Sequence, residues 1–378
     1  MSYKIPLFKL DYDESELEAV AEVINSRWIS QGPKVNQFEE SFSKELQIKH
    51  SIALSNCTTA LHLAMRTLDI RDGDEVICPS LTFVATCNAI RYVGATPVFA
   101  DIEADNRPVI CPKDIEKNVT EKTKAVIVMH YGGFPCDMLE IKRICRKYGL
   151  KLIEDACHAP LSEFKGKKLG TYGDVSCFSF FSNKNIGIGE GGMICTNNDA
   201  YASRLRLLRS HGMTSMSYER SKGHSTTYDV IDFGYNYRMD DIRASLGIIQ
   251  LQKHKEKIIN RSLARERYIN SLTLNEHVTI PFKDYNETVS NYIFPIFVKS
   301  GDIETRDRLR DFLHESGIQT SLHYPAVHAF SVFKPFYKPL TVTERYVERT
   351  LTLPLYSDMA IEDIDFITDK VNEFFASF

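Results

Sequence analysis

The chain has 378 residues, of which 43% are hydrophobic and 25% charged, and its formal net charge is -4. These fractions are typical of a soluble globular protein and exclude a disordered, collagen-like or coiled-coil chain. No basic run is long enough for a phosphate-binding stripe and no apolar run reaches about 18 residues, so we expect neither nucleic acid nor a membrane as a partner.

Short apolar runs alternate with helical segments over the first 250 residues. The predicted buried strands are 51–54, 75–78, 97–100, 125–129, 152–154, 175–180 and 192–196. Segments with helical spacing lie at 59–68, 82–92 and 136–148. This alternation predicts a mostly parallel sheet with helices on both faces. Right-handed crossovers would bring the carboxyl ends of the strands to one edge, where ligands bind in open α/β sheets.

The pattern changes near residue 240. Residues 241–271 are predicted to form one long helix, followed by a strand at 291–298 and helices at 304–316 and 361–375. At roughly 100–200 residues per domain, the length also favours two domains. We therefore predict a large domain at 1–250, with an N-terminal arm, and a small C-terminal α+β domain at 251–378.

The nine cysteines all precede residue 200 and include no C-x-x-C pair. An odd number without pairing spacing argues against a disulfide framework or a zinc site. The first eight residues lack the apolar core of a signal peptide. The simplest expectation is a protein of the reducing cytoplasm.

Lys184 follows the apolar run at 175–180 and precedes a loop with four glycines between residues 187 and 192. A lysine so close to a buried strand is unusual, because lysine normally lies on a solvated face. A partly desolvated amine suits Schiff-base chemistry, whereas the alternative is a strand that ends in a polar turn. Gly187, Gly189 and Gly192 also match G-x-G-x-x-G, but they lead into a strand instead of opening a helix, which argues against a dinucleotide fingerprint.

Asp155 lies at the carboxyl end of the strand predicted at 152–154, on the ligand edge. A carboxylate there can hold a proton on a heterocyclic nitrogen through a charge-assisted hydrogen bond, and His158 lies three residues further on. Two alternatives are that Asp155 caps the next turn or that Asp155, Cys157 and His158 ligate a metal ion. Because nothing else in the sequence supplies a matching ligand pair, we expect no metal site.

Two further segments follow strands at the same edge. Residues 55–62 form a small polar turn that opens a helix, and the free N–H groups of a first helical turn can bind phosphate; an ordinary helix cap is the alternative. Phe83 follows the strand at 75–78, where a flat ring could stack on a planar cofactor. A plain core position is the more frequent role of a phenylalanine.

Together these segments resemble the DegT/DnrJ/StrS family of pyridoxal-phosphate-dependent sugar aminotransferases. The resemblance spans nearly the whole chain. It is carried in order by WISQGP at 28–33, GDEV at 73–76, PSLTF at 79–83, EDA at 154–156, SFFSNKNIGIGEGG at 179–192, GYNYRM at 234–239, HYP at 323–325 and LPL at 353–355. It implies the aspartate aminotransferase-like fold (fold type I), an α/β architecture with a mostly parallel central sheet and a smaller C-terminal α+β domain.

The resemblance also implies roles for single residues. Lys184 matches the lysine that joins the cofactor covalently, and Asp155 matches the carboxylate paired with the pyridine nitrogen. The other matched cofactor positions are Thr58, Thr59 and Ser179 at the phosphate, Phe83 against the ring, His158 near the ring hydroxyl, and Asn236, which matches an asparagine that reaches the neighbouring subunit's cofactor. Trp28, Arg238, His323 and Tyr324 match substrate-binding positions. Cys57 departs from the family, which usually has glycine at that turn.

These matches imply a homodimer with shared active sites that acts in surface-polysaccharide or amino-sugar biosynthesis. The expected reaction is ping-pong: an amino acid, L-glutamate by resemblance, leaves its amino group on pyridoxal phosphate, and a keto sugar, usually nucleotide-linked, receives it. The alternatives are a sugar dehydratase with the same cofactor, amino transfer to a long-chain keto acid sugar, and a non-catalytic regulatory relative. Lys184 favours the aminotransferase, since the dehydratases have histidine there. The identity of the sugar is expected to depend on loops that include 215–227 and 323–328.

Overall fold

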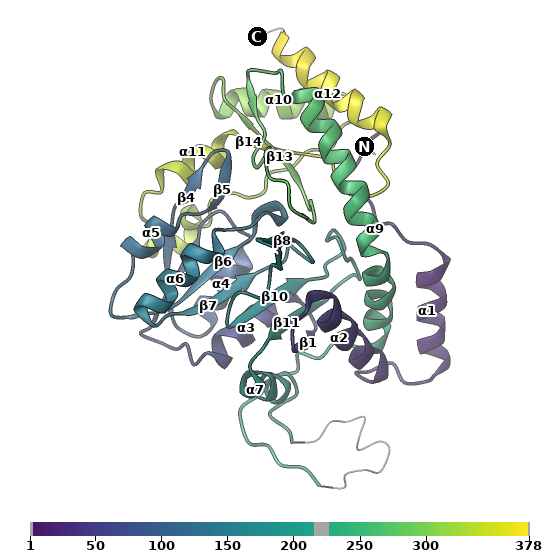
Figure 1. Ribbon diagram of the computed structural model, residues 1–378, viewed down its shortest axis with the longest axis vertical. Coiled ribbons are helices and arrows are strands. Elements are labelled where there is room, and N and C mark those ends of the chain that lie inside the picture. The colour runs from purple at the N-terminus through teal and green to yellow at the C-terminus, as the bar shows by residue number, and fades with distance from the viewer. Residues whose placement is uncertain (1–2, 215–226, 377–378) are drawn as a thin grey trace.

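A seven-stranded sheet forms the centre of the computed structural model, which describes residues 3–214 and 227–376 (Figure 1). The strand order is β1-β11-β10-β7-β6-β2-β3. These strands are β1 (His50–Leu54), β2 (Glu75–Pro79), β3 (Thr96–Ala100), β6 (Thr123–Met129), β7 (Lys151–Asp155), β10 (Val175–Ser179) and β11 (Gly192–Thr196). Strand β11 runs antiparallel to both of its neighbours and the remaining pairs are parallel. The predicted mostly parallel sheet is therefore present.

Helices cover both faces of this sheet. Ile52 and Leu54 pack with residues of α3 (Cys57–Thr67), α4 (Val84–Tyr92) and α7 (Asp199–Arg209). Ala53, between them, joins a second core with α2 (Pro33–Leu46) and α6 (Met138–Tyr148). Because alternate side chains of a strand point to opposite faces, a strand buried on both sides must be apolar throughout. This is why the strands are visible in the sequence as short apolar runs.

A smaller three-stranded antiparallel sheet lies toward the C-terminus, in the order β12 (Val278–Thr279), β13 (Phe294–Val298) and β14 (Thr350–Leu353). It shares a separate apolar core with α10 (Ile303–Glu315) and α12 (Ile361–Ala376). The helix α9 (Asp241–Leu272) runs from the large sheet to this second core (Figure 1). Since α9 continues unbroken through residue 250, the domain boundary placed there stays a prediction.

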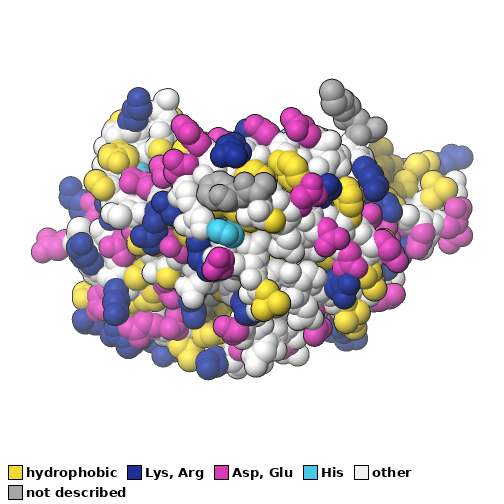
Figure 2. All heavy atoms as spheres, turned by 90° about the horizontal axis from the view of Figure 1, so that it is seen from above, with side chains coloured by type: hydrophobic (Ala, Val, Ile, Leu, Met, Phe, Trp, Pro, Cys, Tyr) yellow, Lys and Arg dark blue, Asp and Glu magenta, His cyan; other side chains and the backbone are white. Residues whose placement is uncertain are grey.

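The remaining elements are short or lie outside the two sheets. They are α1 (Glu14–Asn25), α5 (Pro112–Lys117), α11 (Thr341–Arg349), the hairpins β4 (Ile102–Ala104) with β5 (Arg107–Ile110) and β8 (Glu163–Phe164) with β9 (Lys167–Lys168), and the short 3-10 helices at Tyr131–Gly133, Val327–Ala329 and Ser331–Phe336. Within the described residues, no helix has both the length and the apolar character needed to cross a membrane. Seen from above, positive and negative side chains are interspersed and form no large patch of one sign on the described part of the visible face (Figure 2).

The predicted elements match the observed ones closely, with differences at their ends. The strand predicted at 291–298 begins only at Phe294, because Asn291 has a φ of 47° and turns the chain before the strand starts. The helix predicted from residue 59 begins at Cys57, where the Asn56 side chain accepts a hydrogen bond from the Thr59 N–H at 3.0 Å. Such a cap satisfies an N–H group that has no partner within the helix.

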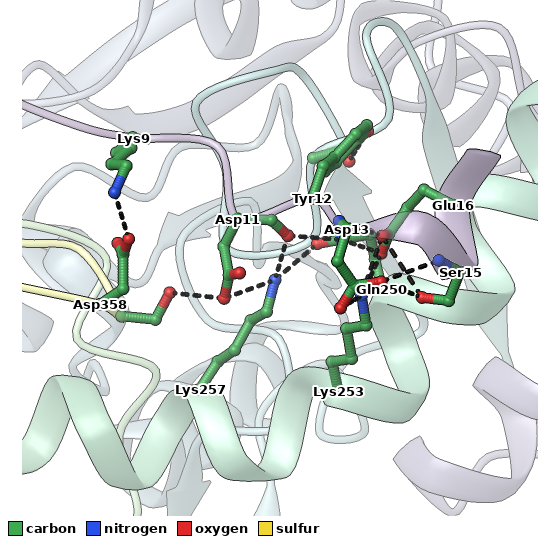
Figure 3. A network of polar contacts seen from close by, with 12 residues as sticks. Lys9, Asp11, Tyr12, Asp13, Ser15, Glu16, Gln250, Lys253, Lys257 and Asp358 are labelled. Atoms are coloured by element: carbon green, nitrogen blue, oxygen red, sulfur yellow. Dashed lines mark hydrogen bonds and ion pairs between the residues drawn. The ribbon is translucent and has the colours of Figure 1, made fainter.

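The N-terminal arm is held against α9 by a network of charges (Figure 3). Lys257 Nζ lies 3.1 Å from the Asp11 carbonyl oxygen and 3.3 Å from its carboxylate. One turn earlier, Lys253 Nζ lies 2.8 Å from both carboxylate oxygens of Glu16. Between these anchors, the Tyr12 hydroxyl donates to the Gly187 carbonyl at 2.7 Å. The arm thereby connects α9 to the glycine-rich loop that follows Lys184.

Candidate functional site

A cavity of about 380 Å³ opens at the carboxyl-terminal edge of the large sheet, where the ligand site was expected. Its walls come from segments that follow β1, β2, β7 and β10, together with parts of the C-terminal half of the chain. The predicted site residues that line it are Thr58, Phe83, Asp155, His158, Ser179, Lys184, His323 and Tyr324. Tertiary structure thus brings together residues that are up to 266 positions apart in the sequence.

Asp155 ends β7 and is 3% exposed. Its Oδ2 accepts a hydrogen bond from the Thr86 hydroxyl at 2.7 Å, and its Oδ1 accepts one from the Cys157 N–H at 3.2 Å. No lysine, arginine or histidine of the described chain forms an ion pair with this carboxylate within 4.0 Å. A buried carboxylate normally requires a cation or several donors, so a charged N–H donor that entered the cavity would complete its environment.

Lys184 lies in the loop after β10, and its Nζ is 4.1 Å from the centre of the Tyr292 ring. An ammonium over an aromatic face is stabilised by the ring quadrupole. Apart from this contact, no hydrogen bond or ion pair to Nζ is seen among the described residues. The amine therefore remains accessible to a carbonyl group in the cavity.

His158 uses both of its ring nitrogens within the protein. The Gly132 N–H donates to Nδ1 at 3.3 Å, so the ring proton belongs on Nε2, which lies 2.8 Å from the Tyr324 hydroxyl. Burial, followed by the nearby positive charge of Lys184, lowers the pKa of His158 well below its usual value. Neutral His158 can donate to Tyr324, and the hydroxyl proton of Tyr324 is then free to point into the cavity. The predicted contact of His158 with a cofactor hydroxyl stays a prediction.

His323 and Tyr324 form the side of the cavity contributed by the C-terminal half. His323 Nδ1 lies 3.1 Å from the Thr352 hydroxyl. Burial and the charge of Lys184 lower the pKa of His323 to about 3. Both histidines next to the amine are accordingly neutral at physiological pH.

The first turn of α3 forms the end of the cavity near residues 56–58. Thr58 lines it, but Thr59 does not: its hydroxyl donates to the Asn56 carbonyl at 2.7 Å and stabilises the turn. Ser179 also lines the cavity, at the end of β10. Of the three residues predicted at a phosphate, the structure therefore brings Thr58 and Ser179 to the cavity and gives Thr59 a local partner.

Phe83 is 56% exposed and stands at the N-terminal end of α4. Its ring centroid is 5.9 Å from that of Tyr324. The more frequent alternative for this residue, a position in the core, is therefore wrong. An exposed ring at the mouth of a cavity is available for stacking on a planar ligand.

Three other predicted residues are not among those that line the cavity in the described chain. Trp28 donates its Nε1–H to the Gln31 carbonyl at 3.1 Å. Asn236 pairs through its backbone with Ser210, and Arg238 pairs with Leu54. Their predicted roles in binding cofactor or substrate stay predictions. Residues 215–226 of the expected specificity loop lie outside the described residues.

Sequence reasoning assigned neither Tyr292 nor Thr86 to the site, and it considered Cys157 only as a metal ligand. Tyr292 lies under the Lys184 amine and 4.1 Å from the His158 ring, centroid to centroid. Thr86 supports Asp155, and Cys157 lines the cavity beside Cys57. The Thr86 hydroxyl also lies 2.8 Å from that of Thr82, four residues earlier, but this spacing alone does not point to Asp155. Nothing in the sequence places Tyr292 next to Lys184.

The residues present fit pyridoxal phosphate. The cavity offers a lysine amine for the aldehyde and hydroxyl groups of Thr58 and Ser179 beside a helix N-terminus for the phosphate. It also offers, for the protonated ring nitrogen, a buried carboxylate that has no cationic partner among the described residues. The exposed ring of Phe83 supplies a flat face. Each part of the cofactor therefore meets a group of suitable chemistry.

Comparison with known proteins agrees with this geometry. The model of the DegT/DnrJ/EryC1/StrS aminotransferase family matches residues 10–372. The spore coat polysaccharide biosynthesis protein SpsC of Bacillus subtilis is 36% identical over 380 residues, which cover 99% of this chain and 96% of that protein.

Solved structures of similar chains cover the whole fold. PseC of Helicobacter pylori, an aminotransferase involved in the biosynthesis of pseudoaminic acid, superposes with a TM-score of 0.93 at 28% identity and covers 100% of both chains. The PLP form of the sugar aminotransferase Spr1654 of Streptococcus pneumoniae, itself described as putative, has a TM-score of 0.91 at 27% identity and covers 98% of both chains. The predicted family, fold class and enzyme class are confirmed.

Proposed function

Because this chain belongs to the DegT/DnrJ/EryC1/StrS aminotransferase family, whose members use pyridoxal phosphate, we propose that it transfers an amino group from an amino acid to a keto sugar in the cavity described above. The observation that carries the proposal is the convergence of the Lys184 amine and the buried Asp155 carboxylate on one cavity. The two residues come from adjacent strands, β10 and β7, whose carboxyl ends meet at this edge.

We assign the cofactor contacts as follows. Lys184 would hold the aldehyde carbon, Asp155 the protonated ring nitrogen, Thr58 and Ser179 the phosphate, and Phe83 one face of the ring. When bound, pyridoxal phosphate supplies an electron sink for a carbanion next to nitrogen. Asp155 keeps the ring nitrogen protonated through a charge-assisted hydrogen bond, and Thr86 fixes the carboxylate for that purpose.

The chain's own proton carrier is Lys184. With the cofactor bound, Nζ would be placed to take a proton from the donor's amino-bearing carbon and deliver it to the cofactor carbon, as a positioned general base and acid does. The neutral side chains of His158 and His323 leave this proton on Lys184 instead of competing for it. Tyr324, oriented by His158, is placed to donate a hydrogen bond to a substrate oxygen.

We infer the substrates from the relatives. PseC acts in pseudoaminic acid biosynthesis and SpsC in spore coat polysaccharide biosynthesis, which supports a sugar acceptor here, and family resemblance favours L-glutamate as donor. Lys184 argues against the dehydratase alternative, because the dehydratases have histidine at this position. A long-chain keto acid sugar as acceptor is the second candidate. The nine free cysteines support a reducing, cytoplasmic setting.

We further propose a homodimer. Val230, Ile231 and Phe233 expose large apolar side chains just before Asn236, and Phe233 is 90% exposed. Exposed apolar clusters of this kind mark interaction surfaces. A second copy that covered them would bring Asn236 toward the partner's cofactor, as the family resemblance implies.

The decisive experiment is Lys184→Ala compared with Lys113→Ala, an exposed lysine of α5. We expect wild type and Lys113→Ala to be yellow, to retain the cofactor on Lys184 after borohydride reduction, and to convert glutamate plus a keto sugar into an amino sugar detected by mass. Lys184→Ala should lose both covalent attachment and turnover. A colourless wild type that takes up no added cofactor would contradict the proposal, and a product that loses a hydroxyl without gaining nitrogen would favour the dehydratase.

A further inference from the structure

Two cysteines meet in the wall of the cavity. Cys57 is the first residue of α3 and Cys157 lies two residues after Asp155, and their Sγ atoms are 3.0 Å apart. They are 100 residues apart in the sequence and share no recognisable spacing. Both residues line the cavity; Cys57 is 8% exposed and Cys157 is half-buried.

We propose that Cys57 and Cys157 form a reversible disulfide when the cavity is free of cofactor, with a small-molecule disulfide such as oxidised glutathione as the oxidant, and that this bridge weakens cofactor binding. The second part rests on the proposed function, because it assumes that the cofactor occupies this cavity.

The sulfur pair has the separation that the reaction needs. A disulfide bond is about 2.05 Å long, so closing the bridge requires the two sulfurs to approach by roughly 1 Å. A second close pair, Cys78 and Cys87, has sulfurs 3.9 Å apart, but both are fully buried and neither lines the cavity. Access therefore distinguishes the pair at the cavity from the pair in the core.

The surroundings of the two thiols decide which of them ionises first. The hydrogen bond from Cys157 favours the Cys57 thiolate, but burial and the Asp155 charge outweigh it and raise the pKa of Cys57 to about 11. Burial raises the pKa of Cys157 well above the usual value. Cys57 is thus the first of the two to ionise, and because only thiolates attack disulfides, oxidation should be slow at neutral pH and faster at alkaline pH.

The reaction balances without further reactants. The Cys57 thiolate attacks one sulfur of oxidised glutathione and expels one glutathione thiolate, which leaves a mixed disulfide on Cys57. The Cys157 thiolate then attacks the Cys57 sulfur and expels the second glutathione thiolate. Two protein thiols lose two electrons, one glutathione disulfide gains them, and the two released protons convert the expelled thiolates to thiols.

The cofactor and the disulfide would involve the same part of the cavity, formed by the first turn of α3 and the segment after β7. The oxidant must enter the cavity to reach Cys57, and a cofactor held by Thr58 and Asp155 would cover the sulfurs that lie next to both residues. Conversely, the bridge pulls the first turn of α3 toward the segment after β7 and shifts Thr58 relative to Asp155. Where the bridge and the bound cofactor exclude each other at equilibrium, each weakens the other by the same factor.

The test uses the full-length protein freed of cofactor, incubated with oxidised glutathione at mildly alkaline pH and mapped by peptide mass. We expect a Cys57–Cys157 linkage, no Cys78–Cys87 linkage, and strong protection when pyridoxal phosphate is added first. Cys111→Ser, which removes a cysteine outside the cavity, should behave like wild type. If Cys57 and Cys157 remain thiols while Cys111 is modified, the proposal is wrong.

The effect on the cofactor is measured separately, by titrating pyridoxal phosphate into reduced and oxidised protein and following visible absorption. Oxidised wild type should bind at least several-fold more weakly and recover with dithiothreitol. Cys57→Ser and Cys157→Ser should show no difference between the two conditions, and equal binding by reduced and oxidised wild type would overturn this part. If the reduced protein binds no cofactor, the proposed function fails, whereas the peptide map still decides whether the bridge forms.

Discussion

The environment of Asp155 depends on hydrogen bonds from its neighbours. It is 3% exposed, and a carboxylate so buried is tolerated only when donors replace the water it has lost. The Thr86 hydroxyl, 0% exposed, is one of the two donors seen in the described chain. Helix α4, which follows β2, brings Thr86 to the end of β7. A helix that follows one strand thus sets the environment of a residue on another strand.

Replacing Thr86 by valine tests this support, since valine has nearly the same shape and no hydroxyl. A hydrogen bond to a charged group contributes about 1.5–3 kcal/mol, so we expect the dissociation constant of pyridoxal phosphate to rise about tenfold or more. The readout is the visible absorption during cofactor titration. Thr86→Ser keeps the donor and should bind nearly as wild type does; a valine variant with unchanged affinity would show that Thr86 does not support Asp155.

The helix α9 connects the two cores and carries a buried histidine. His254 is fully buried and its Nε2 lies 3.1 Å from the Pro160 carbonyl oxygen. Burial is the main cause that lowers the pKa of His254 to about 4, and Arg261, Lys257 and Lys168 lower it further. His254 is therefore neutral in the folded protein and donates its Nε2 proton to Pro160.

This histidine makes the fold sensitive to acid. In the unfolded chain this histidine has a pKa near 6.5 and is protonated between about pH 6.5 and 4. In the folded protein His254 stays neutral over this range. Its contribution to the free energy of unfolding therefore falls as the pH drops from about 6.5 to 4. The loss approaches about 3 kcal/mol. His254→Gln retains a donor for Pro160 but cannot titrate. In urea unfolding at several pH values, wild type should lose more stability than this variant between pH 6.5 and 4; parallel profiles would contradict the assignment.

At the scale of the whole molecule, the N-terminal arm links α9 to the loop of Lys184 (Figure 3). Glu16 is 2% exposed, and its carboxylate is met by Lys253, by the Gln250 amide at 2.7 Å and by the Asp13 N–H at 2.8 Å. Burial alone would raise the pKa of Glu16, but these hydrogen bonds outweigh it and lower the value. The charged network therefore favours docking of α1 and the arm on α9.

Lys253→Met should undock this arm. The substitution leaves the Glu16 carboxylate buried without its cation. Breaking a fully buried ion pair lowers the free energy of unfolding by about 3–5 kcal/mol. Because Lys253 is partly exposed, we expect a smaller loss of about 2–4 kcal/mol. The measurements are urea unfolding and hydrogen exchange of residues 7–25 and 182–190, both of which should report weakened protection. Lys255→Met, two residues along the same helix, loses only an exposed pair with Glu45 and should cost less than about 1 kcal/mol. Equal effects of the two variants would refute the role of Lys253.

The sequence by itself determined the strands and the alternation of strands with helices. It also singled out Lys184 and Asp155 as candidate site residues. The strands are buried on both faces and therefore apolar throughout, and a lysine or aspartate where such a strand ends stands out in the sequence. The local pattern of apolar and polar residues is sufficient to predict these features, because each depends only on residues that are close together in the sequence.

Only the tertiary structure decided which side chains meet. Tyr292 lies 108 residues from Lys184, Cys57 lies 100 from Cys157, and Thr86 lies 69 from Asp155. Such contacts arise where the ends of different strands and the C-terminal half of the chain are packed together, and no local pattern encodes their distance. The same packing set the neutral state of His158 and His323, since desolvation depends on everything that surrounds a group and not on the residues next to it in sequence.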